Sequence, residues 1–176
     1  LLGVSSAATH LQASRIARET AIRMFSAASA ADAAPILFDG RMASRAGAAY
    51  AGAMQIDSLD AHDGFSLAKG HAGCALLPGL AALQYGQGVS GRDFLASLVI
   101  GYELACRAGV ALHDTTSDYH TSGAWVALAV AALGIRVAGG TAGQLREALG
   151  IAEYYGPRSQ MMREIDNPTM LHDGSG

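Results

Sequence analysis

Alanine dominates this sequence, and its valines, isoleucines and threonines never form an alternating polar and apolar run. Alanine is the strongest helix former, whereas a half-buried strand shows a period of two. The chain is therefore predicted to be all-α. Only residues 36–39, which end at the turn-like pair Asp39 and Gly40, resemble a short extended piece.

Short polar residues of the kind that cap helices precede most of the predicted helices. These caps are Thr9 for a helix to about residue 31, Ser44 for 44–54, Ser90 with Asp93 for 90–110, Thr121 or Ser122 for 125–137, and Thr141 with Gln144 for a helix that stops at Gly156 and Pro157. A further apolar run covers 74–85. Because residues 125–137 are apolar almost all round, this helix is predicted to be the most buried one.

The composition favours one packed domain and argues against several classes of partner. At 176 residues and 51% hydrophobic, the chain can build one core but not two large domains. The net charge is −3 and no cluster of lysine or arginine is present, so neither nucleic acid nor an anionic membrane is expected to bind. Apolar runs are interrupted before the roughly 20 residues of a membrane span, and no signal peptide opens the sequence. We therefore expect a soluble, cytoplasmic protein.

The two cysteines, Cys74 and Cys106, are too far apart for a CxxC pair and too few for an iron–sulfur cluster. We expect them to be small buried side chains, and we expect no cofactor. The chain begins at Leu1 rather than methionine and ends soon after a polar segment that resembles the start of a motif. Residues 1–176 are therefore expected to form a single helical domain of an incomplete protein.

The predicted helices carry more apolar surface than a chain of this size is expected to cover by itself. A second copy of the chain, or a further domain, is predicted to cover these residues, which are Leu80, Leu83, Val126 and Val130.

Polar side chains are concentrated in residues 57–72, a predicted loop between two helices. Catalytic groups are often found on loops held by rigid elements. Glycines at positions 64, 70 and 73 are expected to supply backbone freedom to this loop. Its ionisable residues are Asp57, Asp60, His62, Asp63, Lys69 and His71.

This loop has three possible interpretations. A carboxylate paired with an imidazole suits proton abstraction, because an imidazole titrates near neutral pH while the acid orients it. The second interpretation is a solvated segment whose aspartates cap helices, which local composition alone favours. A metal site is the third interpretation, since His62, His71 and Asp60 are acceptable ligands for zinc or iron, although no tight motif such as HExxH is present.

Four other histidines lie outside this loop. His120 precedes an apolar helix, where the positive end of the helix dipole favours a neutral imidazole that can accept a proton. An isolated histidine at such a place is more often a capping or loop residue. His113, near the end of the preceding helix, is expected to be charged, and His10 is expected to be exposed. His172 lies in a polar turn that contains glycine and fits either kind of role.

Six short segments stand in a characteristic order: DGRMAS at 39–44, AAYAGA at 48–53, DSLDAHD at 57–63, GHAGCALLP at 70–78, SGRDFL at 90–95 and GYELACR at 101–107. In order and spacing they resemble the N-terminal half of the MmgE/PrpD family. That family includes 2-methylcitrate dehydratase, cis-aconitate decarboxylase and iminodisuccinate epimerase. The resemblance runs from Ala28 to the end, and no single segment is decisive.

The resemblance implies a large helical domain, a smaller α/β domain supplied by later sequence, and a dimer. It also implies site residues. The family's catalytic aspartate, the first of its D-x-D-D-T pattern, matches Asp60, and Asp63 matches a later acid of that pattern. The histidine of its His-Pro-Gly-like turn matches His71, and the histidine that opens its central helix matches His120. A basic residue before a glycine-rich turn, usually lysine, matches His172.

Three positions depart from the family pattern. His62 stands where an acid is usual. Gly64 stands where many members have threonine, which removes a possible hydrogen bond to substrate. His172 stands in place of lysine, so a nearly permanent cation is replaced by a side chain that is mostly neutral at pH 7, which weakens binding of a di- or tricarboxylate. The end of the chain is most similar to the epimerase-like branch.

These observations lead us to expect a metal-independent lyase or isomerase that acts on a small di- or tricarboxylate. The enzyme would remove a proton next to a carboxylate and then expel water or carbon dioxide, or reprotonate the carbon. His71 or His120 would be the base or acid, Asp60 would orient its partner, and His172 would complete the catalytic set. Asp60, His71 and His120 are predicted to converge on one pocket.

Asp63, Lys69 and Gly64 are expected to contact the substrate, while Arg107 is a weaker candidate because it lies inside a long helix. The alternative is a catalytically impaired homologue, a ligand-binding or structural dimer whose site has decayed through the changes at Gly64 and His172.

Overall fold

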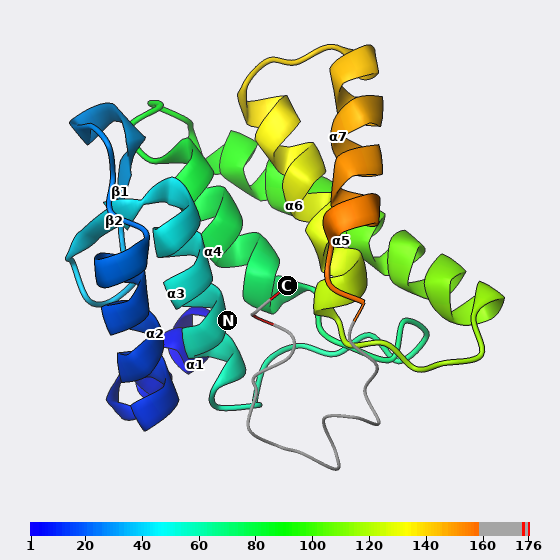
Figure 1. Ribbon diagram of the computed structural model, residues 1–176, viewed down its shortest axis with the longest axis horizontal. Helices are drawn as coiled ribbons and strands as arrows, with labels where there is room; N and C mark the ends of the chain where they lie inside the picture. The colour runs from blue at the N-terminus through cyan, green and yellow to red at the C-terminus, as the bar shows by residue number, and fades with distance from the viewer. Residues whose placement is uncertain (159–173, 175) are drawn as a thin grey trace.

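The computed structural model describes residues 1–158, 174 and 176, and within them it contains seven α-helices and one two-stranded sheet (Figure 1). The predicted all-α fold is confirmed. In chain order the elements are α1 (Leu2–Ala7), the 3-10 helix η1 (Ala8–His10), α2 (Gln12–Met24), a second 3-10 helix η2 (Ala30–Asp32), β1 (Ala33–Pro35), β2 (Met42–Ser44), α3 (Arg45–Asp57), α4 (Gly73–Gln84), α5 (Gly91–Thr115), α6 (Gly123–Val137) and α7 (Ala142–Tyr155).

Three of the predicted caps are confirmed. The hydroxyl of Ser44 accepts a backbone N–H in the first turn of α3, and that of Ser90 does the same for α5, each at 3.1 Å. Thr141 and Gln144 make both hydrogen bonds of a capping box at the start of α7. Each of these bonds satisfies a backbone N–H that has no partner within the helix.

The predicted cap at Thr9 is wrong. Its hydroxyl donates to the carbonyl of Ser6 in α1 at 2.8 Å, and α2 begins after Leu11 instead. The helix also ends at Met24, earlier than predicted, because Phe25 leaves the helical region with φ −125° and ψ 47°.

The extended piece predicted at residues 36–39 is displaced. These residues form the turn between β1 and β2, which pair antiparallel with Ala34 opposite Ala43. Ile36 still donates its N–H to the carbonyl of Arg41 at 2.9 Å, and Phe38 takes a positive φ of 57° in the turn. Two strands of three residues each are too short for a periodic signal in the sequence.

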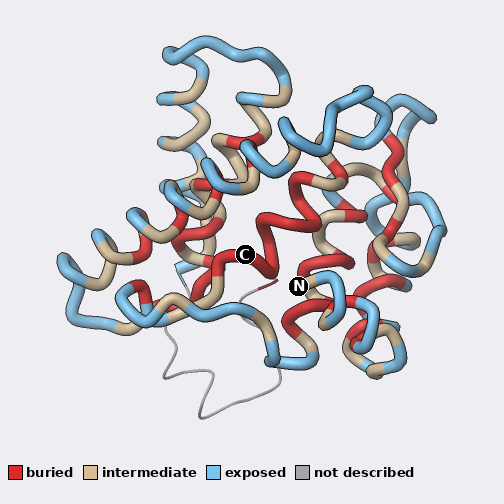
Figure 2. Tube along the Cα trace, turned by 180° about the vertical axis from the view of Figure 1, so that it is seen from behind, coloured by how far each residue is buried: buried red, intermediate tan, exposed pale blue. Residues whose placement is uncertain are grey.

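The core is centred on α4, which packs against α3 on one side and against α5 and α6 on the other (Figure 1). The buried stretches run through the middle of the molecule, and the outermost turns are exposed (Figure 2). Nine of the twelve residues of α4 are buried, against five of the fifteen of α6. The prediction that α6 is the most buried helix is therefore wrong.

A buried arginine joins α2 to α3. Arg18 donates through Nη1 to Oε1 of Gln55 at 2.6 Å and through Nη2 to the carbonyl of Thr9 at 2.9 Å. Its Nε forms an ion pair at 3.1 Å with Oδ2 of Asp39, in the turn between β1 and β2. The charge is tolerated because three of its nitrogens lie beside oxygen atoms. The hairpin and α2 are thereby fixed against α3.

The apolar residues predicted to need an outside cover are largely covered by the domain itself. Leu80 and Val126 are fully buried, and Leu83 and Val130 pack against the same core. The exposed apolar side chains lie elsewhere, most clearly on α5, where Leu95, Val99 and Ile100 are 61%, 68% and 42% exposed.

Within the described residues, α5 is the one helix long and apolar enough to cross a membrane by length and composition. This differs from the expectation that every apolar run is interrupted before it reaches the length of a membrane span. In the structure α5 packs against α4 and α6.

Candidate active site

The polar segment lies where the sequence predicted it, between the end of α3 at Asp57 and the start of α4 at Gly73. It runs along one end of the helices, across the region where α6 begins (Figure 1). Its position is set by contacts to α5, to α6 and to the segment that joins them.

One set of contacts ties the loop to the start of α6. The backbone N–H of His71 donates to Oγ of Ser122 at 2.8 Å. Ser122 occupies the N-cap position of α6, but its side chain does not cap that helix. The hydroxyl of Tyr119 donates to the carbonyl of Lys69. The second half of the loop is therefore held by residues immediately before α6.

A second contact ties the first half of the loop to α5. The Tyr102 hydroxyl is hydrogen bonded to Asp63, and burial together with this carboxylate raises the pKa of Tyr102. Both side chains meet at the start of α4, where a Cβ on Gly73 would lie 2.2 Å from the Tyr102 oxygen and 2.5 Å from Oδ1 of Asp63. Asp63, predicted to bind substrate, is thus engaged with α4 and α5.

The loop uses its glycines differently from what was predicted. The positive φ angles fall on Asp60 and Lys69, at 48° and 53°, rather than on a glycine. Gly70 is needed for close approach instead, because a Cβ there would lie 2.3 Å from Oγ of Ser122.

Asp60, His62 and His71 form a cluster in which one oxygen or nitrogen from each side chain lies within 4.8 Å of the others. The two imidazole rings are 4.1 Å apart between centroids, tilted by 52°. The His62 side chain is 0% exposed, and its Nε2 lies 3.9 Å from Oδ1 of Asp57, which is itself 4% exposed. The other carboxylate oxygen of Asp57 accepts the N–H of Gly174 at 2.8 Å.

Beside this cluster lies an open pocket of about 440 Å³. Three of the predicted site residues, Gly64, Lys69 and His71, line it together with Phe65, Ser66, Gly70 and Tyr119. His71 is half-buried, so its ring is positioned between the pocket and the buried His62.

His120 lies two positions before Ser122, yet its side chain faces a different group. The residue is 8% exposed, and Nδ1 lies 2.9 Å from the carbonyl of Asp118. Its backbone N–H donates to Nε2 of His113 at 3.2 Å. The structure thus brings Asp60 and His71 together, while His120 is neither in their cluster nor among the residues that line the pocket.

The expected charge of His113 stays a prediction, and its Nε2 lies against the backbone N–H of His120. His10 is exposed, as expected. His172 lies outside the described residues. Arg107 forms a surface ion pair with Glu103 on α5 and is not among the residues that line the pocket.

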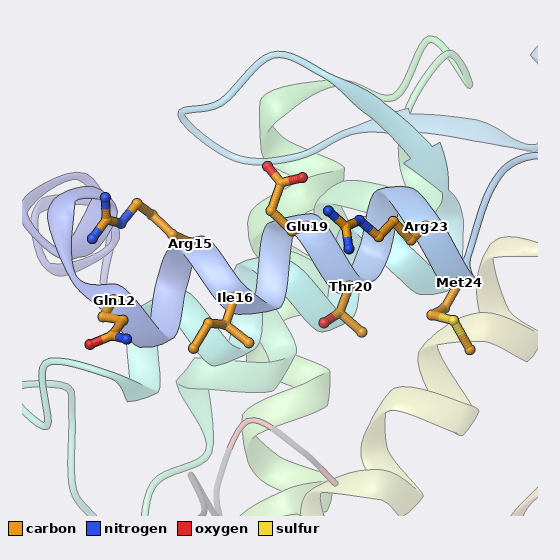
Figure 3. A pocket seen from close by; sticks show the side chains of 7 residues that line it. All are labelled: Gln12, Arg15, Ile16, Glu19, Thr20, Arg23 and Met24. Atoms are coloured by element: carbon orange, nitrogen blue, oxygen red, sulfur yellow. The ribbon is translucent and has the colours of Figure 1, made fainter.

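A second depression, of about 660 Å³, lies along the outer face of α2 (Figure 3). Arg15 and Glu19 extend to one side of the helix in this view, and Ile16 and Met24 to the other. It contains none of the predicted site residues, and it is not part of the candidate site.

No site role was predicted for three residues that build this region, which are Asp57, Ser122 and Tyr119. His62 was predicted only as a candidate metal ligand, and nothing in the spacing indicated that its side chain would be buried beside Asp57. Ser122 carried a signal for a helix cap and serves the loop instead. Tyr119 carried no signal at all.

The cluster combines groups that can take up and return a proton beside an open pocket. A carboxylate and two imidazoles also form a donor set suited to a divalent transition-metal ion. The side-chain types in the cluster are therefore suited both to proton transfer and to metal binding.

Comparison with known proteins agrees with the architecture. The family described as the MmgE/PrpD N-terminal domain matches residues 1–174. No curated protein and no solved structure gives a significant match. Because the match covers nearly the whole chain, the protein belongs to the MmgE/PrpD family, and the chain corresponds to its N-terminal domain.

Proposed function

We propose that this protein is a metal-independent lyase or isomerase that transfers a proton at the carbon next to a carboxylate of a small di- or tricarboxylate. The observation that carries the proposal is the cluster of Asp60, His62 and His71 beside an open pocket. General acid–base catalysis requires a titratable group that a substrate can reach, held in place by its neighbours.

The surroundings of His71 favour it as the group that exchanges the proton. Its ring is partly accessible and its backbone is fixed by Ser122, so its position does not depend on the substrate. His62 and Asp57 lie behind it and hold the ring from the buried side. Asp60 lies within reach of the same imidazole and orients it.

Two further features suit an acidic substrate. Lys69 lines the pocket and supplies a positive charge. The start of α6 lies against the loop at Ser122, and the N-terminus of a helix attracts anions. His120 remains a candidate for a second proton-transfer group, because it lies two positions before Ser122 at the same end of α6.

The proposal is tested by incubating the full-length protein with a panel of citrate-like and aspartate-like acids and following their consumption by NMR. His71→Gln and Asp60→Asn are each expected to lower turnover by about a hundredfold or more, the usual scale for loss of a positioned acid or base. The exposed His10→Gln is the matched control and should retain turnover. Near-normal turnover in both site variants would mean that these residues are structural.

The alternative is a catalytically impaired homologue that binds a ligand or serves as a structural dimer. The absence of a hydroxyl at Gly64, which lines the pocket, favours it. Turnover in the unmodified full-length protein excludes this alternative. Turnover that appears only in His172→Lys supports it.

We also propose that the protein forms a homodimer, with the exposed apolar side chains of α5 in support. Light scattering of the full-length protein should report twice the monomer mass. A stable monomer at micromolar concentration would contradict the proposal.

A further inference from the structure

We propose that Asp60, His62 and His71 bind one zinc ion, and that zinc at this position inhibits proton transfer by the same residues. The binding part of this proposal stands on the geometry alone. The inhibition part rests on the proposed function.

The donor set has the composition of a three-residue zinc site. Zinc is commonly held by two histidines and one carboxylate, with a water molecule as the fourth ligand. Ligand atoms at about 2.0–2.2 Å from a tetrahedral ion lie about 3.3–3.6 Å from one another. The donor atoms of Asp60, His62 and His71 already lie within 4.8 Å. The three donor atoms therefore need to move only a short distance toward one another to hold the ion. Asp60 can make this movement, because its side chain is exposed and is not held by the packing around the two imidazoles.

On the buried side of the cluster, a carboxylate lies beside one of the two histidines, as it does in many zinc sites. A histidine that binds zinc commonly directs its other nitrogen to a carboxylate, which fixes the ring and raises its basicity. Asp57 lies 3.9 Å from Nε2 of His62 and is the carboxylate on the buried side of the cluster. Asp57 is in turn held by the N–H of Gly174.

His71 cannot bind zinc and accept a proton from the substrate at the same time. An imidazole bound to zinc has donated the lone pair that would otherwise accept a proton. The open pocket leaves room for water on the ion, so the ion does not need to displace a protein group. Magnesium should not compete, because it prefers oxygen ligands and keeps its water.

The binding test is a calorimetric titration of the metal-stripped protein with zinc chloride and, separately, with magnesium chloride. One zinc per chain and no magnesium binding are expected. His62→Gln, His71→Gln and Asp60→Asn should each weaken zinc binding by at least about tenfold, since each removes one of three ligands. Asparagine is chosen at position 60 because it tolerates the positive φ found there. His10→Gln, at an exposed histidine outside the cluster, should bind zinc like the unmodified protein.

Zinc affinity unchanged in the three site variants, or lost in His10→Gln, would overturn the site, as would the absence of binding to the unmodified protein. X-ray absorption at the zinc edge gives a reading that does not depend on whether a variant folds. Two imidazole ligands and no sulfur are expected, and a sulfur ligand from a cysteine would overturn the assignment.

The inhibition test adds zinc to the unmodified protein during turnover and then removes it with a chelator. Turnover should fall in proportion to occupancy and return after chelation. Full turnover with zinc bound would overturn the inhibition and leave the proposed function intact. If no acid in the panel is turned over, the proposed function fails, whereas the titration still decides the zinc site.

Discussion

The backbone N–H of His71 donates to the hydroxyl of Ser122 at 2.8 Å, across 51 positions of sequence. This bond connects the end of the polar loop to the first residue before α6. It replaces the capping bond that a serine at this position would otherwise make to its own helix. The location of the candidate proton-transfer histidine is therefore set by α6.

Ser122→Ala is expected to lower the free energy of unfolding by about 1 kcal/mol, the typical net contribution of one hydrogen bond. It should lower turnover by about tenfold or more, since small displacements of a catalytic group have large effects on rate. Urea denaturation and the substrate panel measure the two effects. Ser117→Ala, at an exposed serine between α5 and α6, is the control and should change neither. An unaltered rate in Ser122→Ala would show that this bond does not position His71.

Two helical glycines should respond to alanine with opposite signs. In α5, a Cβ on Gly109 would lie 2.7 Å from Cβ of Ala68 and 2.9 Å from Cδ2 of Trp125. Gly109→Ala should therefore destabilise the protein by about 1–3 kcal/mol through overpacking. Gly150 in α7 has no atom within 4 Å of its would-be Cβ, so Gly150→Ala should stabilise by about 0.5–1 kcal/mol. Thermal unfolding of the two variants measures both, and shifts of the same sign would contradict the packing of α5 against the loop.

The contribution of Asp39 to stability should depend on pH. The hydrogen bond from Arg41 lowers the pKa of Asp39 in the folded protein, and the charge of Arg18 acts in the same direction. The unfolded chain therefore takes up this proton more readily than the folded chain does. The contribution is complete above the unfolded pKa of about 3.9 and is lost as the pH falls through the lower, folded pKa.

Asp39→Asn removes this titration while retaining the shape of the side chain. Between about pH 5 and pH 3, the free energy of unfolding should fall more steeply in the unmodified protein than in Asp39→Asn. Chemical denaturation at several pH values provides the comparison. Parallel pH dependence in the two proteins would show that Arg41 and Arg18 do not favour the charged carboxylate.

Local signals in the sequence predicted the starts of α3, α5 and α7 because caps act within one turn. Ser44, Ser90 and Thr141 each bond to a backbone N–H three residues away, so the information lies in a short stretch. Burial is different, because it depends on which elements surround a helix. α4 is more buried than the more uniformly apolar α6, since it lies between α3 and both α5 and α6.

The candidate site was predictable in its residue types but not in its geometry. The concentration of acids and histidines identified the loop, and the family resemblance selected Asp60 and His71. The burial of His62 against Asp57 and the bond from His71 to Ser122 depend on contacts between distant parts of the chain. A single sequence contains no local pattern for such contacts.

The central claim is that His71 exchanges a proton with the carbon next to a substrate carboxylate. The most direct measurement is deuterium incorporation at that carbon, followed by proton NMR in heavy water with the full-length protein and each acid of the panel. Exchange is expected for at least one acid in the unmodified protein and in His10→Gln, and it should be about a hundredfold slower in His71→Gln. Equal exchange rates in the unmodified protein and His71→Gln would contradict the account.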